Sequence, residues 1–198
     1  LLSTGYWAAK IGEITPGDTV AVLGAGPAGL CTMMCARLYS PGKIIAVDTD
    51  SRRLQTAREN GLADVLLNPG DMTGEELETA VKQESHGRGA DAVFEVAGGE
   101  DTFQTAWKIA RPNAVVAVVA MYEEDQTLPL PRMYGKNLIF KTGGVDGSDC
   151  GRIMELIQAG MLNTECLITH RTTLDNLMEA YDIFENKKEG VIKIAVTV

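Results

Sequence analysis

The stretch that decides the fold is Val20-Ala21-Val22-Leu23-Gly24-Ala25-Gly26-Pro27-Ala28-Gly29. Its apolar residues predict a buried strand over 19–23, and a helix is predicted over 27–39. The three glycines between these two elements follow the pattern G-x-G-x-x-G. A strand, a glycine turn and a helix in this order are typical of a dinucleotide-binding βαβ unit.

The three glycines have separate roles in such a turn. Gly24 permits the tight turn, Gly26 lets the backbone come close to a pyrophosphate, and Gly29 lets the helix pack closely on the sheet. Pro27 and Ala28 open the helix, whose first N–H groups and positive dipole end favour an anion. The motif alone is weak evidence, because a glycine-rich turn can also arise by chance.

Asp48 supplies the second part of the signal. It follows the predicted strand 43–47 and lies 19 residues after Gly29. A carboxylate at this position accepts hydrogen bonds from the adenosine ribose hydroxyls and repels a 2′-phosphate, which favours NAD over NADP. Arg52 and Arg53 lie just beyond and could neutralise such a phosphate. We interpret them mainly as solvated residues of a first helical turn, with Arg53 contacting the ribose edge.

Apolar runs alternate with helix-like segments along the whole chain, as in βαβ units. The alternation predicts a doubly wound parallel sheet of the Rossmann type, with three layers in the order α/β/α. Strands are expected at 19–23, 43–47, 64–67, 92–95, 114–120, 137–142 and 192–198, and helices at 3–11, 27–39, 51–59, 75–85, 102–110, 150–159 and 174–186. Ligands lie beyond the carboxyl ends of parallel strands, so residues 96–99, 120–122 and 142–144 are expected to line the site.

Composition places the chain among globular proteins. Of 198 residues, 45% are hydrophobic and 23% charged, and the formal net charge is −9. The acidic balance argues against nucleic acid or an anionic membrane as the partner. No apolar run is long enough to span a bilayer, and four cysteines without a Cys-x-x-Cys pair suit a reducing cytoplasm. The first residue is Leu1, so we treat the chain as a possible fragment.

Candidates for metal binding or acid–base catalysis are poor. His86 lies in a predicted surface turn, and His170 precedes a predicted helix. Cys31 and Cys35 share one helix face, where packing explains them without a ligand. We therefore expect neither a metal site nor a catalytic residue in this chain.

Six segments in register resemble the zinc-type medium-chain alcohol dehydrogenases: residues 3–9, 16–20, 24–29, 87–91, 167–171 and 190–193. The resemblance covers essentially the whole chain. It implies a cofactor-binding domain over 1–198, in which about 150–198 forms a C-terminal segment that packs on an absent GroES-like domain. The family's zinc ligands lie in that absent part, so the chain alone is expected to be catalytically incomplete.

The resemblance also assigns further site residues. It places Thr4 and Ala28 near the nicotinamide, Val96, Ala97, Ala120 and Met121 along its pocket, and Lys193 near the pyrophosphate. It further implies a homodimer formed through the edge strand 137–142. The alternative is that Lys136 and Asn137 merely protect an exposed sheet edge.

The function expected from the resemblance is hydride transfer between an alcohol and NAD, with zinc present only in the full-length enzyme. One alternative is an NADPH-dependent quinone reductase of the same superfamily, against which Asp48 argues. Another is a non-catalytic module that senses NAD(H).

A methyltransferase is disfavoured, because Val22-Leu23 precede Gly24 where such enzymes usually carry an acidic residue. We also expect exposed apolar faces on helices 150–159 and 174–186.

Overall fold

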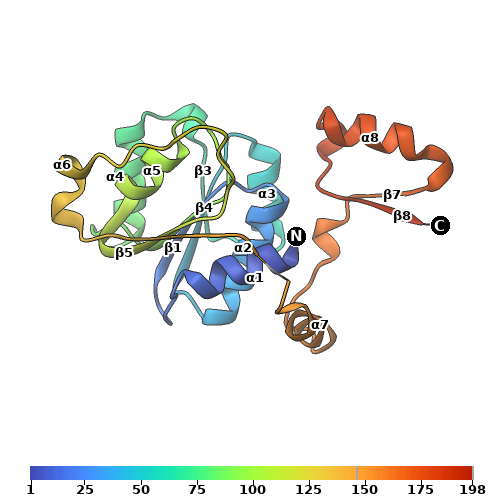
Figure 1. The fold of residues 1–198 in the computed structure, drawn as a ribbon, viewed down its shortest axis with the longest axis horizontal. Helices are drawn as coiled ribbons and strands as arrows, with labels where there is room; N and C mark the ends of the chain where they lie inside the picture. Colours follow the sequence, from blue (N-terminus) through green and yellow to red (C-terminus); the bar gives the residue numbers. More distant parts are fainter. Residues whose placement is uncertain (146, 198) are drawn as a thin grey trace.

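A six-stranded parallel sheet forms the centre of the molecule, and its strand order is β3-β2-β1-β4-β5-β6 (Figure 1). The computed structural model describes residues 1–145 and 147–197. The strands are β1 (Thr19–Leu23), β2 (Lys43–Val47), β3 (Val65–Leu67), β4 (Ala90–Glu95), β5 (Ala110–Val118) and β6 (Ile139–Thr142). The order reverses between β1 and β4, which is where doubly wound sheets bind ligands. The predicted fold class is confirmed.

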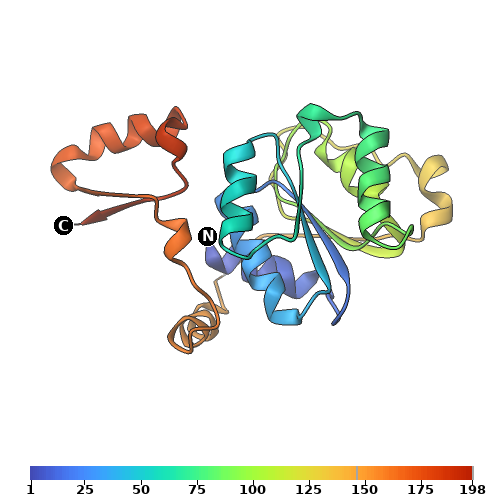
Figure 2. The same ribbon diagram turned by 180° about the vertical axis from the view of Figure 1, so that it is seen from behind.

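Helices cover both faces of this sheet. They are α1 (Leu2–Ile11), α2 (Pro27–Ala36), α3 (Ser51–Glu59), α4 (Gly74–Glu84), α5 (Thr102–Ile109) and the short α6 (Leu130–Met133). Val20 and Val22 of β1 pack in one apolar cluster with residues of α1, α2 and α3, whereas Ala21 and Leu23 pack in a second cluster with α4 and α5. Alternate residues of a fully buried strand thus face opposite helical layers, which gives the α/β/α arrangement seen from both sides in Figures 1 and 2.

Most predicted boundaries agree with the structure to within two residues, and the larger differences have local causes. α1 starts at Leu2, one residue before the predicted start, and its N-cap Leu1 makes no side-chain hydrogen bond. β5 begins at Ala110 rather than at residue 114, because the chain pairs with β4 through an irregular register around Ala92. Asp50 caps α3 by accepting a hydrogen bond from the Arg52 amide.

The C-terminal segment forms a small lobe beside the sheet (Figure 1). After α7 (Cys150–Gln158), β7 (His170–Thr173) pairs in parallel with β8 (Ile194–Thr197), and α8 (Leu177–Glu185) connects them. The sequence does not predict β7, because His-Arg-Thr-Thr has no apolar alternation. The predicted last strand extends to Val198, which lies outside the described residues.

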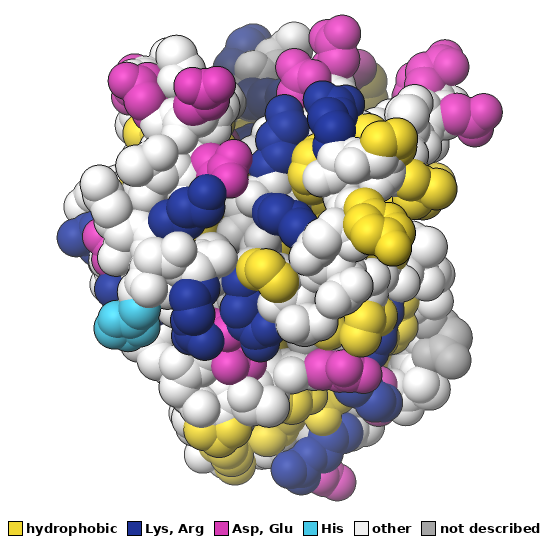
Figure 3. Space-filling view, turned by 90° about the vertical axis from the view of Figure 1, so that its left-hand side faces the viewer, with side chains coloured by type: hydrophobic (Ala, Val, Ile, Leu, Met, Phe, Trp, Pro, Cys, Tyr) yellow, Lys and Arg dark blue, Asp and Glu magenta, His cyan; other side chains and the backbone are white. Residues whose placement is uncertain are grey.

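The expected exposed apolar face is confirmed for α8 and only partly for α7. On α8, Met178 is 79% exposed and Tyr181 is 61% exposed. On α7, Ile153 and Leu156 are buried, and Met154 is the large apolar side chain that stays open to solvent. At the opposite end of the molecule, Lys and Arg side chains are interspersed with Asp, Glu and apolar ones (Figure 3). Across residues 1–145 and 147–197, no helix is both long and apolar enough for a membrane span.

Candidate cofactor-binding site

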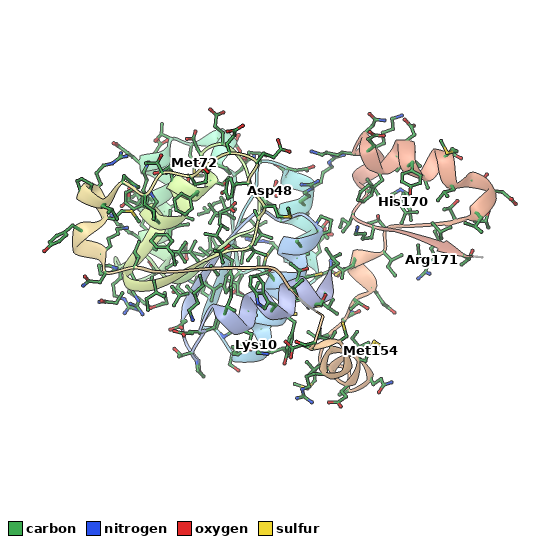
Figure 4. The ribbon with its side chains drawn as sticks, viewed as in Figure 1. Lys10, Asp48, Met72, Met154, His170 and Arg171 are labelled. Atoms are coloured by element: carbon green, nitrogen blue, oxygen red, sulfur yellow. The ribbon has the colours of Figure 1, made fainter. Side chains whose placement is uncertain are left out.

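A cavity of about 470 Å³ lies at the carboxyl ends of β1, β2 and β4. Figure 4 labels Asp48, which stands at this edge where β2 ends. Ten of the residues predicted for the cofactor site line the cavity: Gly24, Gly26, Pro27, Ala28, Gly29, Asp48, Arg53, Val96, Ala97 and Gly99. The sheet therefore brings together three segments that are far apart in the sequence.

Two glycines of the turn pack closely against the protein, whereas the third faces open space. Gly24 has a φ of +100°, and a Cβ there would lie 3.1 Å from the Ala97 amide nitrogen. A Cβ on Gly29 would overlap the carbonyl oxygen of Gly24, and would lie 2.8 Å from its carbonyl carbon. A Cβ on Gly26 would meet only the Arg53 Nη1 atom, at 3.6 Å. The space beside Gly26 is thus open, as the approach of a pyrophosphate requires.

The N-terminus of α2 opens onto the same space. Gly26 is the N-cap and has no side chain to satisfy the first amides, and Pro27 at the first position has no N–H. The first intrahelical hydrogen bond runs from the Leu30 amide to the Gly26 carbonyl, at 2.9 Å. The amides of Ala28 and Gly29 precede it, and such groups have no intrahelical partner. Together with the helix dipole they can bind an anion.

Asp48 holds the turn from the other side. One carboxylate oxygen accepts a hydrogen bond from the Ala25 amide at 2.6 Å, and the other accepts one from the Asp50 amide at 2.8 Å. Each carboxylate oxygen has more than one acceptor position, so both can still accept from a ribose hydroxyl. Sequence reasoning predicted the ribose contact but missed that Asp48 also braces the glycine turn.

Arg53 supplies a positive charge to the cavity wall, whereas Arg52 does not. Arg53 lies in the first turn of α3 and lines the cavity next to Gly26. The Arg52 guanidinium instead pairs with Asp50 at 3.1 Å. That ion pair and its hydrogen bonds lower the pKa of Asp50.

Four of the residues that the resemblance assigned lie outside the cavity lining. Thr4 is in α1, and Ala120 and Met121 follow β5, with Met121 94% exposed. The Lys193 Nζ atom lies 4.9 Å from the centre of the Phe184 ring in the C-terminal lobe. Their roles toward a cofactor stay predictions.

Sequence reasoning also missed part of the lining. Thr102 and Thr105 of α5 and Leu77 of α4 face the cavity, although no motif marks them. The available signal was topological, since α5 begins directly beyond β4. Residues 142–144, which the same rule favoured, do not line the cavity.

The described residues do not fit a zinc site. Within 1–145 and 147–197, no three His, Cys, Asp or Glu side chains are placed to share a metal ion. The His170 ring contacts Thr169 at 2.9 Å and Glu189 at 3.4 Å. Burial raises the pKa values of Cys31 and Cys35 to about 12, so both stay neutral thiols at ordinary pH. We assign no zinc-dependent step to these residues.

Comparison with known proteins agrees with this geometry. Residues 27–163 match the family described as zinc-binding dehydrogenase. The chain belongs to this family. An alcohol dehydrogenase from Cupriavidus necator is 35% identical over 202 residues, covering 99% of this chain and 54% of that protein. An NADP-dependent isopropanol dehydrogenase from Thermoanaerobacter brockii is 31% identical, covering 99% of this chain and 56% of that protein.

Solved structures of alcohol dehydrogenases contain the fold of this chain. A zinc-dependent alcohol dehydrogenase from Streptococcus pneumonia superposes with a TM-score of 0.92 at 29% identity, over 100% of this chain and 57% of that one. The alcohol dehydrogenase TADH from Thermus sp. ATN1 gives a TM-score of 0.89 at 29% identity, over 99% of this chain and 57% of that one. The chain thus spans about half the length of the relatives it matches.

Proposed function

We propose that this chain is the NAD(H)-binding half of a zinc-dependent alcohol or polyol dehydrogenase, which transfers a hydride between an alcohol and the nicotinamide. The observation that carries the proposal is the open space at Gly26, between the N-terminus of α2 and the carboxylate of Asp48. When bound, the nicotinamide would accept or give the hydride. The zinc-dependent part of the reaction is assigned to the portion of the relatives' length that this chain does not span.

The cavity suggests how each part of the cofactor would be held. The adenosine ribose would donate hydrogen bonds to Asp48, and the pyrophosphate would lie against Gly26 and the first amides of α2. Arg53 would offset the negative charge of the pyrophosphate. The nicotinamide end would then extend along Val96 and Ala97. In this arrangement the ribose meets a hydrogen-bond acceptor, the pyrophosphate meets backbone amides and a positive charge, and the nicotinamide meets apolar side chains.

Selectivity for NAD(H) over NADP(H) rests on Asp48. A 2′-phosphate would take the place of a hydroxyl beside a carboxylate whose oxygens are held in place by two backbone amides. The like charges would repel each other. The positive charge of Arg53 would instead attract a 2′-phosphate, and it supports the alternative of an NADPH-dependent reductase.

The non-catalytic alternative also has one supporting observation. The cavity that would hold NAD(H) is formed by the described residues, whereas no three of their His, Cys, Asp or Glu side chains are grouped to bind a metal ion. In this alternative the chain would act as a module that senses the redox state of the cofactor. The four free cysteines support the further proposal of a reducing cytoplasmic setting.

The C-terminal lobe supports the proposal that this chain works as part of a larger protein. A two-stranded sheet is marginal in isolation, and among the described residues β7 and β8 pair only with each other. A groove of about 300 Å³ between α8 and β8 is lined largely by apolar side chains, among them Tyr181, Phe184 and Ile194. We propose that the additional length present in the relatives covers this groove.

The sheet edge at β6 supports a homo-oligomer. Within residues 1–145 and 147–197, β6 pairs with β5 alone, and Ile139 on it is 48% exposed. The Lys136 ammonium donates hydrogen bonds to the carbonyls of Trp107, Lys108 and Ala110, so it caps α5 and does not protect the edge. We propose that two copies pair through this strand.

Chemical-shift mapping with ¹⁵N-labelled protein tests the location of the cofactor. Addition of NAD⁺ should shift the amides of Gly24, Gly26, Ala28 and Val96, and should leave the amides of α8 in place. Shifts confined to the C-terminal lobe, or no shifts at saturating NAD⁺, would contradict the proposal.

A further inference from the structure

β4 ends in a carboxylate that is wholly buried. Glu95 is the last residue of this strand and is 0% exposed. It lies between Leu23 of β1 and Val118 of β5, in the middle of the sheet. Burying a carboxylate is costly unless hydrogen bonds compensate for the lost water. The hydrogen bonds of Glu95 therefore indicate the structural role of this carboxylate.

One oxygen of Glu95 holds the loop that follows the strand. Its Oε1 atom accepts hydrogen bonds from the Ala97 amide at 3.0 Å and from the Gly98 amide at 2.9 Å. The main-chain carbonyl of Glu95 accepts from the Val119 amide at 2.8 Å and from the Ala120 amide at 3.1 Å. This single residue thus joins the loop after β4 to the loop after β5.

The loop 96–99 is wedged between two other parts of the site. A Cβ on Gly24 would lie 3.2 Å from Ala97 Cα, so the loop touches the glycine turn. A Cβ on Gly98 would lie 3.2 Å from the Met121 carbonyl oxygen, so the loop also touches the segment after β5. Val96, Ala97 and Gly99 line the cofactor cavity between these contacts. A shift of the loop would change the cavity wall directly.

Thr102 and Tyr122 hold the far end of the same loop. The Thr102 hydroxyl donates to the Gly99 carbonyl at 2.9 Å, which leaves the Tyr122 hydroxyl to donate to Thr102 Oγ1 at 2.9 Å. Burial, together with the neighbouring Glu95 carboxylate, raises the pKa of Tyr122 to about 12, so the phenol stays a donor. The second oxygen of Glu95, Oε2, is buried and accepts no hydrogen bond from the described residues.

We propose that Glu95 is a positioning residue for the cofactor, which fixes the loop 96–99 at the nicotinamide end of the cavity through the two hydrogen bonds to Oε1. The identity of the ligand rests on the function proposed above, whereas the fixing of the loop does not. Glu95→Gln retains an oxygen for both loop amides, while it removes the charge and replaces Oε2 by an amide nitrogen near Tyr122. Glu95→Met keeps the volume and removes the acceptor.

Amide hydrogen exchange tests the loop without any cofactor. In Glu95→Met, the amides of Ala97 and Gly98 should exchange at least about tenfold faster relative to core amides of β1, and in Glu95→Gln they should stay within about threefold of wild type. Glu95→Asp, which withdraws the carboxylate by one methylene, is the second variant if Glu95→Met does not fold. Unchanged exchange in Glu95→Met or Glu95→Asp would overturn the proposal.

Titration with NADH tests the consequence for binding, with Asp91→Leu as the matched control. Asp91 is the other buried carboxylate of β4, and it accepts the Thr19 amide at 2.8 Å, near the strand end remote from the cavity. Glu95→Met should raise the NADH Kd by about tenfold or more, Glu95→Gln should restore it, and Asp91→Leu should lower stability with an unchanged Kd. Equal losses in Glu95→Met and Asp91→Leu would show a merely structural role. A wild-type protein that binds neither NADH nor NADPH would refute the proposed function, and the exchange data would still decide whether Glu95 fixes the loop.

Discussion

Replacement of Gly26 by alanine is expected to weaken cofactor binding while leaving the stability of the protein nearly unchanged. The backbone at Gly26 has a φ of −68° and a ψ of −175°, an extended conformation that any residue adopts. The added Cβ would meet only Arg53 Nη1, at an ordinary 3.6 Å. The protein without cofactor therefore has no steric reason to reject Gly26→Ala.

The expected effect on stability is small, because two terms offset each other. Restricting the unfolded chain with Ala stabilises the native state by about 0.4–1 kcal/mol. Alanine is a poorer N-cap than glycine, which costs about as much. The free energy of unfolding should thus change by less than about 0.5 kcal/mol.

The expected effect on binding is larger. A methyl group in the open space at Gly26 holds the pyrophosphate away from the first amides of α2. Loss of one charge-assisted hydrogen bond costs about 1.5–3 kcal/mol, which raises the NADH Kd by about 10- to 100-fold. Urea denaturation and NADH fluorescence titration measure the two effects on the same sample. Wild-type affinity, or a loss of stability that accounts for weaker binding, would refute this account of Gly26.

Four further predictions concern Gly29, Asp48 and the cysteine thiols. Gly29→Ala should destabilise the protein by at least about 1–3 kcal/mol in urea denaturation, because its Cβ would overlap the Gly24 carbonyl; unchanged stability would contradict the close packing of α2 against the glycine turn. Asp48→Asn should reduce the ratio of NADPH Kd to NADH Kd by about tenfold, and an unchanged ratio would remove Asp48 as the determinant. At pH 8, a thiol reagent should label the exposed Cys150 and leave buried Cys31 and Cys35 unlabelled until unfolding. The pKa of these thiols is 9.0 in the unfolded chain and about 12 in the folded protein, so Cys31 and Cys35 lower stability as pH rises between those values. Alkaline urea denaturation should therefore show a smaller loss of stability in Cys35→Ala than in wild type.

The sequence was sufficient to predict the sheet and the glycine turn. β1 and β2 are largely apolar runs bounded by turn residues, and such runs form buried parallel strands whatever packs on them. The expected roles of Gly24, Gly29 and Asp48 can be inferred from their residue types alone. A glycine permits positive φ and close packing without a Cβ, and an aspartate supplies a carboxylate.

What the sequence did not reveal depends on contacts between distant segments. Glu95 reads as an ordinary strand end, and only the structure shows the Ala97 and Gly98 amides on its carboxylate. Thr102 enters the cavity because α5 starts where β4 stops. β7 forms because residues 170–173 pair with β8, and its two strand-favouring threonines are too short a signal to predict that pairing.

Parallel fluorescence titrations of this chain with NADH and NADPH test the central claim most directly. The account predicts saturable binding of NADH at least about tenfold tighter than that of NADPH, since Asp48 would repel a 2′-phosphate. Equal or tighter binding of NADPH would contradict the role given to Asp48 and favour the reductase alternative. No binding of either cofactor would contradict the claim that the cavity beside Gly26 is a nicotinamide cofactor site.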